Sequence, residues 1–287
     1  MTVDEEAMEL HRKLNGKIST EAKAKVKDRH DLSVTYTPGV AAPCRLIAKD
    51  PHEAYNYTIK GNTIAVVSDG SAVLGLGNIG PYAALPVMEG KCVLFKEFGG
   101  VNAFPIVLDT QDTEEIIKAV KAIAPGFGGI NLEDISAPRC FEIEERLKAE
   151  LDIPVFHDDQ HGTAIIVLSG IINALKVTHR TVEDTKIVVN GAGSAGVAIT
   201  KLLLRYGFKD ITMCDKTGIL SKNSKEELNW MQKKMVEETN LSGKTGTLAD
   251  ALKGADVFIG VSAPGIVTSE MVSTMNKDAI IFALANP

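Results

Sequence analysis

Short apolar runs recur along the chain, and most of them end at a polar residue or a glycine. In the first half, five runs rich in Val, Ile, Leu and Phe have the length of a strand: 63–68, 92–95, 104–108, 129–132 and 153–156. Short apolar runs bounded by turn residues are typical of strands that are buried on both faces of a sheet. They therefore predict a buried parallel sheet.

Longer segments between these runs have the periodicity of helices. The clearest begins at Asp112 or Thr113 and has apolar residues at intervals of one, three and three: Ile116, Ile117, Val120 and Ile123. Further helices are expected at 8–26 with an interruption at Gly16, at 138–151 after a Ser136 cap, and at 163–175. The Pro-Gly pair at 38–39 predicts a turn over 36–39.

A second series of strands begins near residue 178. Its apolar runs are 186–190, 210–215, 257–261 and 279–284, with a helix expected at 197–206 and others between the later strands. Strands that alternate with helices predict an α/β fold with right-handed crossovers. We expect an N-terminal α/β domain over residues 1–160, followed by a Rossmann-type doubly wound parallel sheet over residues 161–287.

The composition and charge of the chain argue against several classes of function. The net charge of −6 and the absence of a basic block argue against nucleic-acid binding. No apolar run approaches the roughly 20 residues that span a bilayer, and the acidic start lacks the order of a signal peptide, so no membrane role is expected. The four cysteines include no CxxC pair, which disfavours disulfides and zinc and fits a reduced cytoplasm.

Two glycine patterns match GxGxxG, at 75–80 and at 191–196. The second, Gly191-Ala192-Gly193-Ser194-Ala195-Gly196, leaves a predicted strand directly and opens a predicted helix, as a dinucleotide-binding loop must. The first is separated from its strand, and Pro86 should disturb any helix that follows, so we expect a tight loop near a ligand.

Asp215 ends the next predicted strand, about 20 residues beyond the second glycine loop, where a ribose-binding acid belongs. A carboxylate there accepts hydrogen bonds from both ribose hydroxyls and repels a 2′-phosphate, which favours NAD. Lys216 would instead attract that phosphate, so NADP stays open.

Two pairs of acidic residues follow predicted strands: Glu133-Asp134 and Asp158-Asp159. Carboxylates at the carboxyl ends of parallel strands can hold a hard cation such as Mg²⁺ or Mn²⁺. Helix capping is the alternative, and it explains one acid at each place but not two. His157 and His161 lack the glutamate of an HExxH zinc motif, so we expect them to face solvent or form hydrogen bonds.

A cation beside a nicotinamide suggests oxidation of a hydroxy acid. Taken together with this chemistry, the motifs of the chain resemble those of the malic enzymes in their short prokaryotic form. The motifs that carry the resemblance fall in order over essentially the whole chain: Tyr36-Thr37-Pro38-Gly39-Val40, Ser68-Asp69-Gly70, Leu74 to Gly80, Met88-Glu89-Gly90-Lys91, Leu132-Glu133-Asp134, His157 to Thr163, Gly191 to Gly196, and Ala285-Asn286-Pro287.

The resemblance implies oxidative decarboxylation of malate to pyruvate and CO₂, with reduction of NAD(P) and a divalent cation. The N-terminal domain would then be the catalytic domain that binds malate and metal. Matched by position, the implied roles are Lys91 as general base, Tyr36 as general acid, Glu133, Asp134 and Asp159 as metal ligands, Asp158 as the residue that orients Lys91 or water, and Asn286 as a contact to substrate or nicotinamide. Family habit and the apolar N-terminal helix also lead us to expect a homodimer.

Two departures from the family pattern stand out. Ser71-Ala72-Val73 supplies no arginine for a substrate carboxylate, which animal-type members place before the first glycine loop. The chain also ends at Asn286-Pro287, where the family continues, so we expect an incomplete nucleotide domain.

Three alternatives remain. A malolactic enzyme shares these motifs but releases lactate without net NADH. A methylene-tetrahydrofolate dehydrogenase-like enzyme has similar domains but gives no reason for the acidic pairs. A truncated chain would bind dinucleotide without turnover.

Overall fold

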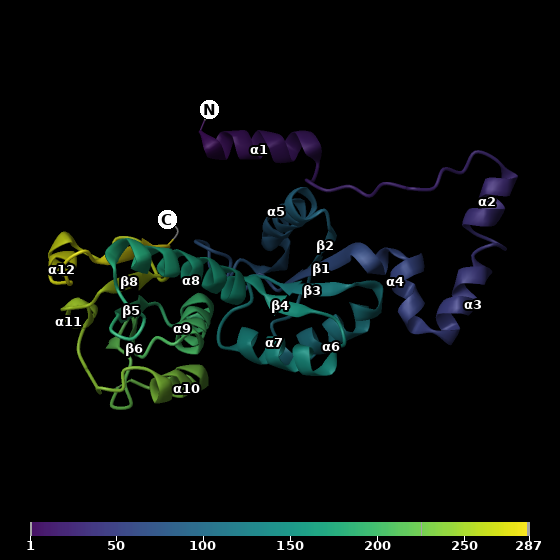
Figure 1. Ribbon diagram of the computed structural model, residues 1–287. Coiled ribbons are helices and arrows are strands. Elements are labelled where there is room, and N and C mark those ends of the chain that lie inside the picture. Colours follow the sequence, from purple (N-terminus) through teal and green to yellow (C-terminus); the bar gives the residue numbers. More distant parts are fainter. Residues whose placement is uncertain (1, 225, 286–287) are drawn as a thin grey trace. The chain divides into compact units, whose positions relative to one another are not determined.

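The computed structural model describes residues 2–224 and 226–285 of the chain. These divide into two compact units, each with its own sheet (Figure 1). Among the described residues, the first unit comprises 2–71, 78–133 and 145–156, and the second comprises 72–77, 134–144, 157–224 and 226–285. The peptide bond between Glu133 and Asp134 is therefore one of the points at which the chain passes from one unit to the other.

The first sheet has the strand order β2-β1-β3-β4. Its strands are β1 (Thr63–Ser68), β2 (Asn102–Val107), β3 (Gly129–Leu132) and β4 (Val155–His157). The central β1 pairs in parallel with both β2 and β3, and its Ala65, Val66 and Val67 are fully buried. The predicted strands at 63–68 and 129–132 are confirmed to the residue.

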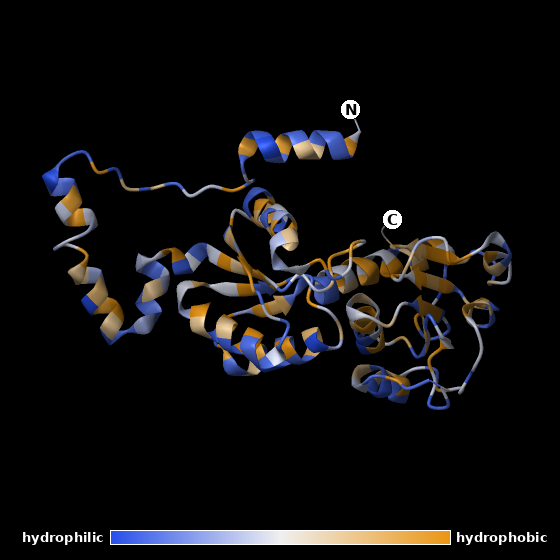
Figure 2. Ribbon diagram, turned by 180° about the vertical axis from the view of Figure 1, so that it is seen from behind, coloured by the Kyte–Doolittle hydropathy of each residue, from blue (hydrophilic) through white to orange (hydrophobic). Residues whose placement is uncertain are grey.

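Two helices cover the faces of this sheet. Helix α5 (Gly80–Gly99) packs on β1 and β2, and α6 (Thr113–Ile123) lies on the other face (Figure 1). Helix α6 buries Ile116, Ile117 and Val120, and Asp112 caps it by accepting from the Glu115 backbone N–H, as predicted. The alternation of polar and apolar colour along α6 shows this amphipathic pattern (Figure 2).

Helix α5 corrects two expectations. Residues 92–95, predicted as a strand, lie inside this 20-residue helix, and Pro86 does not end it. Ala84, Met88 and Cys92 are buried at intervals of four, so the true period is helical and extends beyond the short apolar run. A proline inside a helix costs a backbone hydrogen bond and crowds the preceding turn, yet α5 continues through Pro86 with this face buried.

The N-terminal segment contains four short helices: α1 (Val3–Leu14), α2 (Arg29–Thr35), α3 (Ala41–Lys49) and α4 (Ala54–Tyr57). The single helix predicted at 8–26 is wrong at both ends. Helix α1 starts early because Thr2 and Glu5 form a capping box, and it stops because Asn15 and Gly16 adopt positive φ. The turn at 36–39 is found, and no residue of α1 to α4 is buried.

Three single turns of 3₁₀ helix complete the first unit, at Pro51–Glu53, Ile59–Asn62 and Ala124–Gly126. The second of these leads directly into β1, and Lys60 ties it to the third by donating to the backbone carbonyls of Ala124 and Phe127.

The second unit has a five-stranded sheet of order β7-β6-β5-β8-β9. Its strands are β5 (Lys186–Asn190), β6 (Asp210–Asp215), β7 (Gly218–Ile219), β8 (Val257–Gly260) and β9 (Ile280–Ala283). All neighbours pair in parallel except β6 and β7. The parallel strands match the prediction closely, whereas the two-residue β7 is too short to leave a pattern.

The remaining helices are α7 (Arg139–Glu150), α8 (Asp158–Thr178), α9 (Ser194–Tyr206), α10 (Trp230–Glu238), α11 (Leu248–Leu252) and α12 (Ser269–Ser273). Helix α8 begins at Asp158, five residues before the predicted start at Thr163, so Asp158 and Asp159 lie in its first turn. Its length and apolar composition would suffice to cross a membrane. One face of α8 is instead packed within the unit, with Gly170 against Phe282 and Val167 and Ile171 buried.

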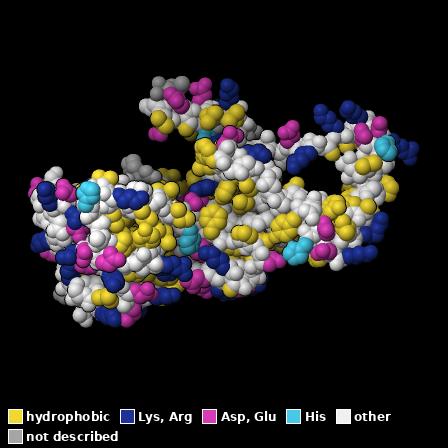
Figure 3. Space-filling model, viewed as in Figure 1, with side chains coloured by type: hydrophobic (Ala, Val, Ile, Leu, Met, Phe, Trp, Pro, Cys, Tyr) yellow, Lys and Arg dark blue, Asp and Glu magenta, His cyan; other side chains and the backbone are white. Residues whose placement is uncertain are grey.

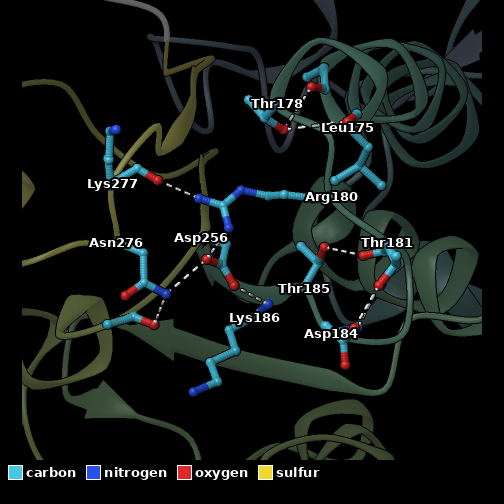
Figure 4. Close-up of polar contacts among 12 residues, drawn as sticks. Leu175, Thr178, Arg180, Thr181, Asp184, Thr185, Lys186, Asp256, Asn276 and Lys277 are labelled. Carbon is cyan, nitrogen blue, oxygen red and sulfur yellow. Dashed lines mark hydrogen bonds and ion pairs between the residues drawn. The ribbon is translucent and has the colours of Figure 1, made fainter.

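A polar network joins the amino-terminal ends of three strands of this sheet (Figure 4). The Asp256 carboxylate, just before β8, accepts from the Arg180 guanidinium, from the Lys186 backbone N–H at the start of β5, and from Asn276 before β9. Arg180 also donates to the Lys277 carbonyl. This edge is thereby fixed by side chains, while the opposite edge carries the glycine loop.

Candidate active site

Three carboxylates converge where β3 ends and α8 begins. Ligand oxygens of Glu133, Asp134 and Asp159 all lie within 4.8 Å of one another, and we call these residues the acidic cluster. Glu133 and Asp134 are buried and Asp159 is partly buried. The three predicted metal ligands are therefore brought together.

Backbone geometry explains how two adjacent residues can contribute. Successive side chains of an extended strand point to opposite faces. Asp134 instead adopts a left-handed conformation with φ +54°, which short polar residues tolerate. This breaks the alternation after β3, and the Asp134 backbone N–H donates to Asp159 Oδ2 at 2.9 Å.

Lys91 extends from α5 to the same place. Its Nζ lies 3.0 Å from Glu133 Oε1, and Asn131 donates to Glu133 Oε2 at 2.8 Å. The Lys91 side chain is 21% exposed, so most of it is withdrawn from solvent. The predicted base is thus paired with a member of the acidic cluster.

The side chain of Asp158, the first residue of α8, lies close to Gly162, which is one turn later in the same helix. A Cβ placed on Gly162 would come 2.5 Å from Asp158 Oδ1, so the glycine leaves space for this carboxylate. The predicted role of Asp158 in orienting Lys91 stays a prediction.

Tyr36 is at the carboxyl end of α2 and 67% of its surface is exposed. Its backbone N–H donates to the Leu32 carbonyl, and its own carbonyl accepts from the Val40 N–H. The role of Tyr36 as general acid stays a prediction.

The two histidines differ from one another. His161 Nε2 lies 2.8 Å from Glu144 Oε2, as expected of a hydrogen-bonded histidine. His157 is fully buried, so the alternative that it faces solvent is wrong, and burial lowers its pKa. Its Nδ1 lies 3.7 Å from Asp159 Oδ2, and neither ring nitrogen forms a well-aligned hydrogen bond within the described chain.

Sequence reasoning missed Glu144, which is 4% exposed on α7. A signal for it exists, because Cys140, Ile143 and Leu147 mark the buried face of that helix and Glu144 falls among them. Gln232 was also missed. It donates to Asp215 Oδ2 at 3.2 Å, while Thr217 donates to Oδ1 through its backbone N–H and its hydroxyl.

The glycine loop between β5 and α9 has the strand–loop–helix arrangement that was predicted. Gly191 has φ +126°, which allows the tight turn. A Cβ on Gly196 would lie 1.7 Å from the Gly191 carbonyl oxygen, whereas a Cβ on Gly193 would meet nothing within 4 Å. The first and third glycines are thus needed for packing, and the second faces open space in which a pyrophosphate would fit.

The other glycine pattern forms a tight loop, as expected. Val73 and Gly77 make a two-way backbone bridge, and Gly75, Gly77 and Gly80 all have φ near +76°. The predicted contact residue Asn286 lies outside the described residues, and its role stays a prediction.

Comparison with known proteins agrees with this geometry. The family "Malic enzyme, N-terminal domain" matches residues 15–148, and "Malic enzyme, NAD binding domain" matches residues 160–287. A NAD-dependent malic enzyme of Geobacillus stearothermophilus is 61% identical over 96% of this chain, which spans 57% of that relative. A bifunctional malic/malolactic enzyme of Bacillus subtilis is 55% identical over the full chain and 70% of its own length.

Solved structures give the same result. A NAD-dependent malic enzyme from Thermotoga maritima has a TM-score of 0.96 at 53% identity over 98% of this chain and 75% of its own. The malic enzyme from Pyrococcus horikoshii has a TM-score of 0.93 at 47% identity over 100% of this chain and 69% of its own. The chain belongs to the malic enzyme family.

Proposed function

We propose that the protein catalyses oxidative decarboxylation of malate to pyruvate and CO₂ with reduction of NAD(P), and that it requires a divalent cation. The observation that carries this proposal is the acidic cluster with Lys91 Nζ 3.0 Å from Glu133. A cation site and a base side by side are what oxidation of a 2-hydroxy acid needs, and the malic enzyme relatives support malate as that acid.

The acidic cluster fits Mg²⁺ or Mn²⁺. All three side chains offer carboxylate oxygens, the ligands that hard divalent cations prefer. Three carboxylates within 4.8 Å, two of them buried, repel one another unless positive charge accompanies them. When bound, the cation would stabilise negative charge that develops on the substrate oxygens.

Lys91 is proposed as the base that takes the proton of the malate hydroxyl at Nζ, while hydride leaves C2 for the nicotinamide. Glu133 Oε1, 3.0 Å away, accepts from Nζ and so directs it toward the acidic cluster. Lys91 acts as the base in its neutral amine form, which keeps N–H donors for Glu133 and a lone pair for the substrate proton. The β-keto acid that results loses CO₂, and Tyr36 returns a proton to C3 of the enol. Asp158 is proposed to keep Lys91 or the surrounding water oriented.

The protein is proposed to be a homodimer. Apolar side chains are exposed along the N-terminal helices, including Met8, Leu14 and Val34, and along α5, including Leu94 and Phe98. Figure 3 shows hydrophobic side chains on the surface of these elements. A second copy that covers these faces would also give the exposed Tyr36 hydroxyl an environment in which it can act.

NAD is the proposed cofactor. The bonds from Thr217 and Gln232 hold the Asp215 carboxylate in place, where it would accept from ribose hydroxyls and repel a 2′-phosphate. Ala192, Ser194 and Ala195 would line the loop with the three glycines, and Asn286 would reach the substrate or nicotinamide. A cytoplasmic location is proposed because all four cysteines are free.

The test uses the full-length protein with malate and NAD, with and without Mn²⁺, and follows both NADH and pyruvate. Lys91→Arg keeps the positive charge beside Glu133 but cannot act as a base, because a guanidinium stays protonated. We expect Mn²⁺-dependent NADH and pyruvate from the wild type and from Lys118→Ala, an exposed lysine on α6, and none from Lys91→Arg.

Retention of activity by Lys91→Arg would refute the role of Lys91. Lactate without net NADH would support the second candidate, a malolactic reaction, which the name of the Bacillus subtilis relative favours.

A further inference from the structure

Glu144 is a buried carboxylate that the proposed reaction does not use. It lies on the inner face of α7 between Cys140 and Leu147, both fully buried. Its two oxygens have different partners: Oε1 accepts from the His157 backbone N–H at 2.9 Å, and Oε2 lies 2.8 Å from His161 Nε2.

These two partners lie on either side of the metal-ligand segment. His157 is the N-cap of α8, and His161 is one turn into it. Asp158 and Asp159 fall between them. Glu144, which belongs to α7, therefore contacts the first turn of α8 at its start, through His157, and at its end, through His161.

The bond to the His157 N–H stabilises the start of α8. In a capping box, the N3 carboxylate accepts from the backbone N–H of the N-cap residue. Glu144 accepts from that same N–H, on the N-cap residue His157, although it belongs to a different helix. Asp159 is then held from two directions, by its position in this turn and by the Asp134 backbone N–H at 2.9 Å.

Packing alone does not account for a carboxylate here. Burying a charge costs free energy that an apolar side chain of similar size would not. Burial, followed by the nearby carboxylates of Asp159 and Glu144, raises the pKa of the Cys140 thiol to about 12. An acidic side chain at this place adds to the repulsion within and around the acidic cluster.

We propose that Glu144 is a positioning residue that fixes the first turn of α8 so that Asp159 is aligned with Glu133 and Asp134 to receive the cation. The inference rests on the proposed metal site. Residues that hold metal ligands in place from outside the coordination sphere typically change metal affinity about 10- to 100-fold when they are removed.

The experiment measures Mn²⁺ binding to the full-length protein by electron paramagnetic resonance, without substrate, and thermal unfolding of the same samples. Glu144→Ala removes both contacts. Glu144→Gln keeps an acceptor for the His157 N–H, and Glu145→Gln removes a charge from the next, exposed position of α7.

We expect Glu144→Ala to weaken Mn²⁺ binding about 10- to 100-fold, Glu144→Gln to recover most of it, and Glu145→Gln to bind as the wild type does. Saturating Mn²⁺ should restore kcat in Glu144→Ala, because the residue acts through Asp159 and not in the chemistry.

A purely structural role would lower the unfolding temperature of Glu144→Ala but leave the Mn²⁺ affinity of the folded protein unchanged, and that result would overturn the inference. If Glu144→Ala does not fold, the His161→Ala variant tests the inference instead. It removes the imidazole that contacts Glu144 Oε2 and leaves Glu144 itself in place. A several-fold loss of Mn²⁺ affinity supports the inference, and wild-type affinity overturns it. A wild type that binds no Mn²⁺ would overturn the proposed metal site together with the inference.

Discussion

Single residues in the first turns of α8 show how a small change could separate stability from catalysis. Gly162 is helical, and alanine in a helix interior is worth about 1 kcal/mol more than glycine. Its Cβ would, however, lie 2.5 Å from Asp158 Oδ1 and push that flexible side chain aside. We expect Gly162→Ala to keep or raise the unfolding temperature while lowering kcat/KM about tenfold or more.

Scanning calorimetry and steady-state kinetics on the same preparation would check both halves of this expectation. Ser169→Ala, at an exposed position of the same helix, is the matched control and should change neither quantity greatly. Undiminished kcat/KM in Gly162→Ala would mean that the position of Asp158 does not matter to the reaction.

The four cysteines give a prediction about reactivity. Burial raises the pKa of the Cys92, Cys140 and Cys214 thiols to about 12, with nearby carboxylates adding to the effect, while Cys44 is exposed. At pH 8 only about one in ten thousand of such buried thiols is ionised, and the thiolate is the reactive form. Alkylation of the native protein should label Cys44 alone among these four, as peptide mapping would show, and rapid labelling of the others would contradict their burial.

At the residue scale, the paired acids stood out in the sequence, Lys91 was named by resemblance alone, and the residues that support them were missed. Paired acids after predicted strands are a local pattern, whereas the importance of Glu144 depends on which face of α7 is buried. The burial of His157 could not be predicted from the sequence either, because the pattern does not show whether the end of a strand is exposed to solvent or covered by other elements. Tyr36 was named by resemblance alone, and its exposed position could not have been foreseen.

At the scale of elements, the parallel strands were predictable because buried strands are nearly continuous apolar runs. The errors have a common cause. Residues 92–95 are as apolar as a strand but belong to α5, where the helical period emerges only over three turns. The early start of α8 was hidden because Asp158 and Asp159 resemble a loop, although acidic residues are favourable in a first helical turn.

The glycine loop allows a paired test of its element. Gly196→Ala would place a Cβ 1.7 Å from the Gly191 carbonyl oxygen, so the backbone must move, and we expect destabilisation of about 2 kcal/mol or more. Gly193→Ala meets nothing within 4 Å and should unfold like the wild type, yet bind NAD much more weakly because the pyrophosphate would meet the new methyl group.

Denaturant unfolding and calorimetric titration with NAD would measure the two effects. The reverse pattern, with Gly193→Ala unstable or with its NAD affinity intact, would show that the second glycine serves the fold and not the ligand.

At the scale of the whole molecule, the most distinctive feature is how little of the N-terminal segment is buried. Helices α1 to α4 contain no buried residue, yet they carry exposed Met8, Leu32 and Val34, and Tyr36 belongs to the same segment. Large apolar side chains left exposed on several helices often mark an interface. If a second copy covers it, Tyr36 would serve the Lys91 of its partner and each active site would be composite.

A mixing experiment tests this arrangement. Lys91→Arg and Tyr36→Phe should each be inactive as full-length homodimers. When equal amounts are unfolded, mixed and refolded together, about half of the dimers should be mixed, as random pairing in a two-fold dimer requires. In a mixed dimer, the intact Tyr36 of one subunit meets the intact Lys91 of the other at one of the two sites. About one quarter of wild-type activity should therefore return. If Tyr36 acts within its own chain, every site in the mixture lacks one of the two groups, and no activity can return at any mixing ratio.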